Sequence, residues 1–367
     1  MTPGLQPLAV VRRRLHAQAL TGASFATPAE AVAWSGAVQA QEYAEALWSL
    51  GMRVRDHAAA DIEAACDRGE ILRTHAMRPT WHFVAAADLR WLLRLTGRRV
   101  QAKSAGRCRE LGLDDDTLAR CLQTLTAVLD DSEPRTRREL AAALGAAGID
   151  MTGQRLAHTL GHAELAGVIA SGPRRGKQHT YLLLEGRVPD APQRSRAGDV
   201  AELVRRYFTS HGPATLRDFA WWSGLTIADG RAGVAAAGEQ LVGEEGSDGT
   251  LWISAAPSPA GGDEPPPSSD AFLLSTFDEL LVAHRDLRNV HPDGRATNDL
   301  LPRPIVVDGV TVGGWTRRLA RREVTIEVAL DEPLDDRRAA ALRAATDRFG
   351  AFLGLAARLA IGPQRGG

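Results

Sequence analysis

Two glutamines, Gln39 and Gln41, lie one residue apart in the stretch "AVQAQEYAEALWSLG" at positions 37–51. A glutamine amide is neither an acid nor a base near neutral pH, but its oxygen accepts hydrogen bonds and its nitrogen donates them. Two such groups aimed at one point can hold a neutral molecule, such as a water, in a fixed position. The alternative is that both are ordinary polar residues of the surface. The direction of the two side chains decides between these interpretations.

The local conformation sets that direction. On a helix, residues i and i+2 point about 200° apart, because the helix has 3.6 residues per turn. In an extended chain they share one face. Glu42 and Glu45 suit the first turn of a helix, where the dipole favours negative charge, and Gly51 suits its end. We therefore expect a helix over about residues 42–50, with both glutamines in the extended chain before it, where their amides can converge.

The segment that begins at Thr136 predicts two helices and a hairpin. Thr136 and Glu139 form a capping box at the start of "TRRELAAALGAAG", and Gly148 ends this helix. "TGQRLAHTLGHAELAG" carries leucines at helical spacing and predicts the second helix. "VIASG" and "HTYLLL" then predict two strands joined by the basic turn "PRRGKQ". Helix, helix and hairpin in this order are typical of a winged helix.

The same order of elements occurs twice more. Thr215 and Asp218 cap a short helix, a second helix follows over about 228–241, and "LVGEEG" and "TLWIS" predict strands. Nearer the N-terminus, a capping box at Thr27 begins one helix and "AADIEAACDRG" forms another. "EILRTHAM" and "TWHFV" then predict strands around the turn at Arg78-Pro79. The repeat is one of architecture rather than of individual residues.

The last hundred or so residues differ in composition. "APSPAGGDEPPPSSD" is rich in Pro, Gly and Ser and predicts an exposed loop or linker. Asp308-Gly309 predicts a hairpin, and "DDRRAAALRAATDRFGAFLG" predicts a closing helix. We therefore predict an α+β fold with three tandem winged-helix units and a C-terminal small β-barrel with its closing helix. The expected units are residues 1–100 with the glutamine pair, 101–192 with a basic wing, 196–255, and 270–367.

Composition indicates an ordinary globular chain. Of its 367 residues, 44% are hydrophobic and 24% are charged, and no apolar window is long enough to predict a membrane helix. The first basic residues follow a short apolar stretch, which is the wrong order for a secretory signal. The three cysteines lack zinc-ligand spacing, so we expect thiols in a reducing compartment and no metal site.

The charge is nearly balanced but unevenly distributed. A net charge of −1 gives no global field that would attract nucleic acid, yet the basic residues are clumped and can form one basic face. In an arginine-rich chain such clumps also arise without function. The clumps are Arg12, Arg13 and Arg14; Arg98 and Arg99; Arg174, Arg175 and Lys177; and Arg317, Arg318, Arg321 and Arg322.

Five stretches together resemble the AlkZ-like bacterial DNA glycosylases, a winged-helix family: "VQAQ", "HAMRPTWHFV", "YFTSHGPATLRDFAWWSGL", "FDELLVAHRDL" and "VVDGVTVGGW". The resemblance runs from about residue 8 to 360. It implies three tandem winged helices, a C-terminal β-barrel and excision of N7-alkylated guanine from DNA. Some members of the family unhook interstrand crosslinks left by DNA-alkylating antibiotics.

The family's catalytic signature is Gln, an aliphatic residue, then Gln or Asp. Gln39-Ala40-Gln41 is similar to the Gln/Gln subgroup, which is associated with self-resistance in antibiotic producers, and Ala40 is a minimal version of the aliphatic position. The resemblance therefore implies that Gln39 and Gln41 are the catalytic residues.

The implied chemistry suits two amides. N7-alkylation puts a positive charge on guanine, so the base leaves without protonation and the sugar becomes oxocarbenium-like. Such an electrophile needs a positioned water more than a strong base. Glutamine carbonyls can orient that water and place partial negative charge near the cation. Neither glutamine forms a bond to the sugar, so we expect a monofunctional hydrolase without lyase chemistry and without a cofactor.

Other candidate site residues are basic. Arg78 and His82 belong to the first predicted hairpin and are candidates for contact with the lesion, although a lone histidine on a strand is often structural. Trp81 alternates with His82 and is expected to face the core. Further candidates for DNA contact are Arg174, Arg175, Lys177 and His179 on the second wing, with a solvated turn as the alternative, and Arg285 and Arg288, which can instead pair with Asp286. Core positions are expected at Tyr207, Phe208, Trp221 and Trp222.

We therefore predict a monomeric, metal-free DNA glycosylase that acts on double-stranded DNA carrying bulky N7-alkylguanine, with crosslinks as a further candidate substrate. A cytoplasmic, nucleoid-associated location without a membrane partner is expected. One alternative is a non-catalytic winged-helix regulator, against which the absence of an obvious dimerisation helix and the glutamine pair both argue. The other is a nuclease, which would need clustered carboxylates for Mg²⁺. The acidic run at 114–116 better fits the start of a helix.

Overall fold

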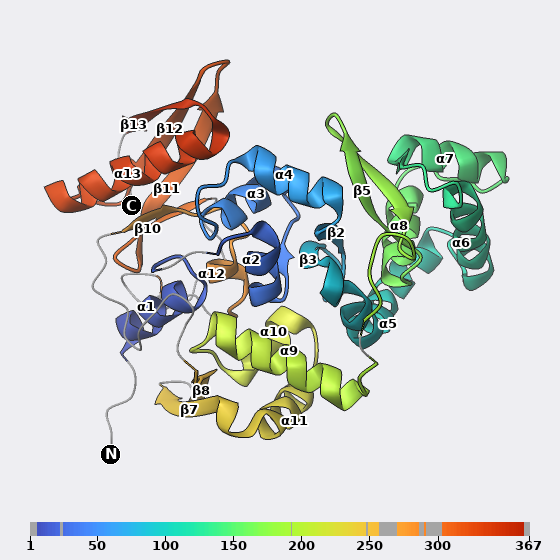
Figure 1. Cartoon of the computed structure of the whole chain (residues 1–367), viewed down its shortest axis with the longest axis horizontal. Coiled ribbons are helices and arrows are strands. Elements are labelled where there is room, and N and C mark those ends of the chain that lie inside the picture. Colours follow the sequence, from blue (N-terminus) through green and yellow to red (C-terminus); the bar gives the residue numbers. More distant parts are fainter. Residues whose placement is uncertain are drawn as a thin grey trace. The chain divides into compact units, whose positions relative to one another are not determined.

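The computed structural model describes residues 6–22, 25–191, 193–246, 249–256, 270–285, 290 and 303–362. Figure 1 shows helices and strands interspersed along the chain, so the fold is α+β, as predicted. The residues group into two compact units. We call Gly36–Gln41 with Glu63–Val200 the glutamine unit, and Met1–Ser35 with Glu42–Ile62 and Ala201–Gly367 the terminal unit.

The glutamine unit contains two sheets of three strands each. Along the chain its elements are β1 (Val38–Gln39), α4 (Ala59–Arg68), β2 (Ile71–His75), β3 (Trp81–Ala85), α5 (Ala86–Glu110), α6 (Asp115–Leu129), β4 (Arg135–Thr136), α7 (Arg137–Ala146), α8 (Arg155–Leu165), β5 (Ile169–Arg175) and β6 (Gln178–Leu183). Along the sequence, α4 and α9 (Arg196–His211) each cross the boundary between the units.

The first sheet has the strand order β1-β3-β2 and is antiparallel throughout. Its register places Gln39 opposite His82, and His82 opposite Thr74 on the other side. Phe83 and Val84 point to opposite faces and are both fully buried, so both faces of this sheet are covered. This explains why Phe83, Val84 and Ala85 form a continuous apolar run in β3 instead of alternating with polar residues.

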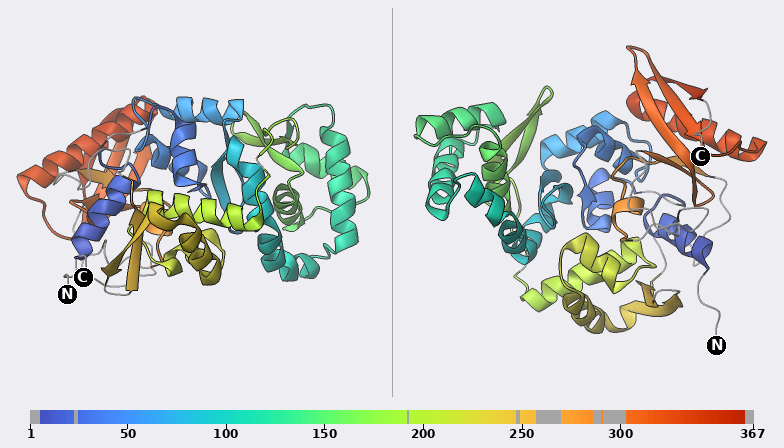
Figure 2. Two further views of the ribbon diagram at one scale, coloured as in Figure 1. Left: turned by 60° about the horizontal axis from the view of Figure 1, so that its bottom comes forward. Right: turned by 180° about the vertical axis from the view of Figure 1, so that it is seen from behind.

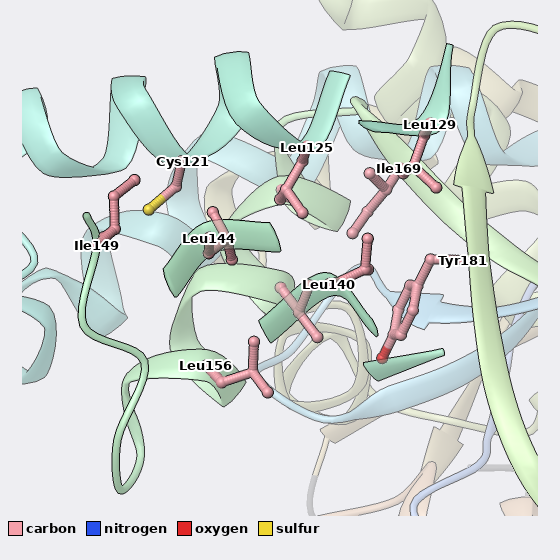
Figure 3. Close-up of a cluster of buried hydrophobic side chains, with 11 residues drawn as sticks. Cys121, Leu125, Leu129, Leu140, Leu144, Ile149, Leu156, Ile169 and Tyr181 are labelled. Atoms are coloured by element: carbon pink, nitrogen blue, oxygen red, sulfur yellow. The ribbon is translucent and has the colours of Figure 1, made fainter. Parts of the chain in front are cut away.

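The second sheet, of order β4-β6-β5, packs with α6, α7 and α8 around a separate hydrophobic core. Figure 3 shows leucines of the three helices pointing toward one another, with Ile169 of β5 and Tyr181 of β6 at one side. Cys121 is part of this core as a buried free thiol. The predicted helices and hairpin of this region are therefore confirmed, and their leucine spacing is the reason for their packing.

The terminal unit holds the remaining elements. They are α1 (Pro7–Ala17), α2 (Pro28–Ser35), α3 (Tyr43–Gly51), α10 (Leu216–Ser223), α11 (Ile227–Ala237), the 3-10 turn η1 (Gly238–Gln240), β7 (Leu241–Gly246), β8 (Gly249–Ser254), β9 (Ala271–Leu273), α12 (Glu279–Val282), β10 (Pro304–Val307), β11 (Val310–Leu319), β12 (Glu323–Leu330), α13 (Asp336–Leu353) and β13 (Ala356–Ile361).

The C-terminal strands form one five-stranded sheet of order β13-β12-β11-β10-β9. β13 is parallel to β12 and the other pairs are antiparallel. Helix α13 contacts this sheet, and the two further views in Figure 2 show it on the same sheet from other sides. β9 and β13 do not pair with each other in the described chain, so the expected small barrel is an open half-barrel here.

Turn and capping signals in the sequence formed as predicted. Asp308 and Gly309 join β10 to β11 with φ angles of +54° and +90°, values that glycine and aspartate tolerate better than most residues. Thr136 caps α7 in a reciprocal capping box, and Thr215 does the same for α10. Thr27 and Glu30 bond each other's backbone at the start of α2.

The predicted aromatic core is right in three positions and wrong in one. Tyr207, Phe208 and Trp222 are fully buried, whereas Trp221 is 54% exposed. On helix α10 the buried Phe219 and Trp222 are three residues apart and share a side, so the residue before Trp222 points away from the core.

Two other expectations concern the course of the chain. The Pro/Gly/Ser-rich stretch that was predicted as a linker lies almost entirely outside the described residues. Asp114 caps α6 by accepting a hydrogen bond from the Thr117 amide at 2.8 Å, which is the helix start predicted for the acidic run. Within the described part of the chain, no helix has the length and apolar character that a membrane span requires.

Candidate active site

The glutamine pair lies where β1 leads toward helix α3. The helix begins at Tyr43 with Glu42 as its N-cap, so the prediction of a helix over about 42–50 is confirmed. Gln39 is in β1, and the Ala40 amide continues the ladder by donating to the Trp81 carbonyl at 2.7 Å. Gln39, and by this continued pairing Gln41 beyond it, therefore leave the chain on the same side, as an extended segment requires.

The β2–β3 hairpin also fixes the backbone of the motif from a second side. The Arg73 guanidinium donates to the carbonyl oxygens of Ala40, at 2.9 Å, and Gln41, at 3.2 Å. The same guanidinium lies 4.4 Å from the centroid of the Trp81 ring, a cation–π contact that limits its movement. The backbone of Ala40 and Gln41 is therefore held by both β2 and β3.

Two donors from the hairpin orient the glutamine side chains. Arg78 donates from Nη2 to Oε1 of Gln39 at 2.9 Å, and Thr80 donates from Oγ1 to Oε1 of Gln41 at 2.8 Å. Because arginine has no acceptor, the atom that Gln39 turns toward Arg78 is its carbonyl oxygen. Both glutamines are half-buried, which limits solvent competition for these hydrogen bonds. A carbonyl oxygen has two lone pairs, so an amide held in this way can also accept a hydrogen bond from a water.

His82 lies beside Gln39 but is fully buried, so a direct contact between this side chain and DNA does not fit its position. Burial, the Arg78 charge and the His75 ring hold the pKa of His82 well below its usual range, with a backbone group of Thr80 acting in the opposite direction. The imidazole is therefore neutral at pH 7.

The other face of the hairpin is occupied by Trp81 and His75, and the expectation that Trp81 faces the core is only partly met. Trp81 is half-buried, and its ring centroid lies 4.6 Å from that of His75. His75 also bonds the buried carboxylate of Glu164 through its ring and its backbone amide. These two rings line a cavity of about 190 Å³ together with residues of α5 and α8. The alternation of β3 puts this cavity on the face opposite to Gln39 and His82.

The second hairpin, β5–β6, carries the other predicted DNA-contact residues. Arg174 is half-buried, pairs with Glu63, and donates its backbone amide to Asp67 at 2.8 Å. Arg175 pairs with Glu139 at 2.8 Å and also donates to a backbone carbonyl. Both arginines are thus committed to neighbouring groups within the unit.

The two remaining predicted residues of this hairpin differ in exposure. Lys177 is exposed at the turn. His179 is half-buried; burial first, and then the charges of Arg73 and Arg174, lower its pKa to about 4. Glu139, the partner of Arg175, has a lowered pKa of about 2. The main cause is the hydrogen bonds from Thr136, and the Arg175 guanidinium is the second.

Arg285 belongs to the terminal unit. Its backbone amide donates to the Asp218 carboxylate at 2.9 Å, and its side chain is exposed. Arg288 and Asp286, which the sequence offered as a phosphate contact and its alternative partner, lie outside the described residues. The structure thus gathers Gln39, Gln41 and Arg78 with His82, while Arg285 is in a separate unit.

Two residues of the site were not predicted from the sequence. Thr80 was missed, although it alternates with His82 along the hairpin and therefore falls on the glutamine side. Arg73 was missed because its role depends on pairing between strands that are distant in sequence. In the described residues, no group of three or more His, Cys, Asp or Glu side chains is arranged to hold a metal ion.

One hairpin thus holds both the backbone and the side-chain amides of the glutamine pair. The chain matches the family described as "DNA glycosylase AlkZ-like" over residues 9–352. Because this match covers most of the sequence, the chain belongs to the AlkZ-like DNA glycosylase family, and the resemblance seen in the sequence is confirmed.

A solved structure agrees with this family at the level of the fold. The DNA glycosylase AlkZ of Streptomyces sahachiroi superposes with a TM-score of 0.78 at 20% sequence identity, covering 98% of this chain and 100% of that one. At 20% sequence identity, this likeness shows that the two chains share a fold. No curated protein matches the chain.

Proposed function

We propose that the chain is a monofunctional DNA glycosylase that hydrolyses the N-glycosidic bond of bulky N7-alkylguanine, with Gln39 and Gln41 as its catalytic residues. The observation that carries the proposal is a pair of hydrogen bonds: Arg78 donates to the side-chain carbonyl of Gln39, and Thr80 donates to that of Gln41. A polar surface pair would not need two donors from one hairpin. Family membership supports the same reaction class.

The proposed mechanism uses position more than acidity. The alkylated base already carries a positive charge, so the C1′–N9 bond breaks with its electron pair moving onto the base. The glutamine carbonyls orient a water toward C1′ and place partial negative charge near the developing oxocarbenium ion. Because each amide is fixed before substrate arrives, little reorganisation is needed in the transition state.

The organisation that we propose around this site is three tandem winged-helix units followed by the C-terminal sheet, over the boundaries expected from the sequence. The order α7, α8, β5 and β6, with β4 as a third strand, supports this for the second unit. Winged helices commonly bind duplex DNA. The proposed partner is accordingly double-stranded DNA, bound by a monomer in the compartment that contains the nucleoid.

The experiment that tests the activity is incubation with duplex DNA containing one N7-methylguanine, followed by separate assays for free base and for strand cleavage. The proposal predicts free N7-methylguanine and an abasic strand that breaks only after heat or alkali. Binding without release of base would identify a regulator. A strand broken without such treatment would identify a nuclease or a lyase.

The proposed substrate range extends to bulky adducts and interstrand crosslinks, and the proposed setting is self-resistance to a DNA-alkylating antibiotic. Both rest on the likeness of Gln39-Ala40-Gln41 to the Gln/Gln subgroup. Excision rates on a methyl adduct, a bulky N7 adduct and a crosslink test them. Faster release of methylguanine than of every bulky adduct would contradict this part of the proposal.

A further inference from the structure

We propose that His82 is a third catalytic residue, which accepts the proton that the attacking water loses. This inference rests on the proposed glycosylase function of the Gln39 and Gln41 site. Hydrolysis at C1′ converts a water and a sugar cation into a neutral hemiacetal, so one proton must leave the water oxygen. A glutamine amide cannot accept it. The site therefore needs a base within reach of the water.

The strand register places His82 next to the proposed water position. Gln39 and His82 are directly opposite each other in the antiparallel pair of β1 and β3. The adjacent pair is joined by the Ala40–Trp81 hydrogen bond, so Gln39 and His82 form the non-hydrogen-bonded kind of pair, in which side chains lie closer. Their Cβ atoms are then about 5 Å apart, so the amide and the imidazole lie side by side on one face of the sheet, and a water bonded to the end of the amide is close to the ring.

The state of the ring fits a proton acceptor. His82 is 0% exposed, and no hydrogen bond of ordinary geometry joins either ring nitrogen to the described residues, although a backbone group of Thr80 favours the protonated ring. A buried polar group without a partner costs stability, so a purely structural role would favour an apolar residue at this position. Thr74, the neighbour of His82 on β2, is also fully buried and uses its hydroxyl on a backbone carbonyl at 3.3 Å.

The charges around the ring keep it unprotonated until the reaction occurs. Besides burial, the positive charge of Arg78 acts on the ring, and so does His75, which bonds Glu164. Both disfavour a proton on His82, as does burial, so its pKa is low and the base is weak. A weak base suffices, because water bound to an oxocarbenium ion is strongly acidic.

The step balances in atoms and charge. The C1′–N9 bond breaks and its electron pair neutralises the alkylated guanine. The water oxygen forms the new bond to C1′, and one water proton passes to the unprotonated nitrogen of the neutral His82 ring. Solvent then removes that proton after the neutral base and the hemiacetal sugar have formed.

The test is single-turnover excision of N7-methylguanine by His82→Ala, with and without added small rings. We expect the rate to fall about 10- to 100-fold, at the low end of what a positioned base supplies, with DNA affinity nearly unchanged. Imidazole should restore part of the rate. Pyrrole fills the same space and has no basic nitrogen, so it should restore none. Equal rescue by both rings would mean that His82 only fills space, and would overturn the proposal.

Two further variants keep the test decisive if the alanine variant folds poorly. His82→Phe retains a buried ring without a base, and His162→Phe makes the same change at a half-buried imidazole of α8 that lies on the other face of the sheet. We expect loss of rate in the first and the parental rate in the second. If folded His82→Phe excises at the parental rate, His82 is not the base. If the parental protein itself releases no base, the proposed function fails instead.

Discussion

The hairpins β2–β3 and β5–β6 belong to the same unit, follow a helix in the same way, and both carry arginines near their turns. Their polar side chains are used differently. In β2–β3, Arg78 and Thr80 donate to the neutral amides of Gln39 and Gln41. In β5–β6, Arg174 and Arg175 are paired with the carboxylates of Glu63 and Glu139.

The difference teaches which hairpin is suited to chemistry. A cation beside a carboxylate is largely neutralised, and such a pair near the surface contributes little to stability or to binding. A donor beside an amide fixes the direction of the amide oxygen. Because the amide is neutral, it does not neutralise the charge of the donor as a carboxylate would. The first hairpin therefore orients two neutral amides, whereas the arginines of the second are used in contacts with α4 and α7.

The largest effect should follow from replacing either Gln39 or Gln41, the two residues that the first hairpin orients. Gln39→Ala or Gln41→Ala should each lower the single-turnover rate of N7-methylguanine release about 10²-fold, the lower end for loss of a catalytic polar group. The double variant should lose less than the product, because both amides hold one water. Quench-flow release assays with excess enzyme measure this. A double loss equal to the product would mean that the two glutamines act separately.

The next largest effect should come from replacing one threonine in each hairpin and comparing the two variants. Thr80 holds Gln41, whereas Thr180 of β6 donates to the Pro173 carbonyl within its own hairpin and is fully buried. Thr80→Val should slow excision about 5- to 10-fold, the equivalent of one hydrogen bond of about 1 kcal/mol. Thr180→Val should lower stability by a similar free energy and leave the rate unchanged. The comparison fails if Thr180→Val slows excision more than Thr80→Val does.

The second hairpin should affect DNA affinity rather than rate. Replacing Arg174, Arg175 and Lys177 with alanine should weaken binding a few-fold, mainly through the exposed Lys177, and leave the rate at saturating enzyme unchanged. Plotted as log affinity against log salt concentration, the slope is negative, and each lost phosphate contact should make it less steep by about 0.9. Fluorescence anisotropy titrations at several salt concentrations measure that slope. If Arg174→Ala alone reproduces the whole loss, its pairing with Glu63 does not neutralise it.

The smallest effect concerns pH. The pKa of His179 is lowered to about 4 in the folded protein, from about 6.5 when unfolded. Between these values the unfolded chain binds more protons, so stability declines as the pH falls from about 6.5 to about 4. His179→Gln should reduce that decline slightly. Urea unfolding at pH 7 and pH 5 measures it, and an unchanged pH dependence in the variant would show that His179 stays exposed to solvent.

The sequence predicted local features of this molecule better than long-range ones. The capping boxes at Thr136 and Thr215 and the turn at Asp308-Gly309 formed, because their signals lie within four residues of one another. The position of the glutamines before a helix was likewise a local property. These features are governed by backbone hydrogen bonds that each short segment makes for itself.

The interactions that were missed depend on pairing between distant segments. Arg174 meets Glu63 across 111 positions, and no periodicity within either segment indicates that contact. The alternation of Trp81 and His82 was visible in the sequence, but it could not show which face would be more deeply buried. His82 is the more deeply buried of the two, because Trp81 lines a cavity on its own face of the sheet.

The most direct test of the central claim compares Gln41→Glu with Gln41→Ala in single-turnover release of N7-methylguanine. Glutamate retains the length of the side chain and an oxygen that Thr80 can hold, so it can still orient the water, and it adds negative charge near the sugar cation. The account predicts that Gln41→Glu retains more activity than Gln41→Ala, with both variants folded and binding DNA as the parental protein does. If Gln39→Ala and Gln41→Ala both fold, bind and excise at the parental rate, the pair is polar surface and the active site lies elsewhere.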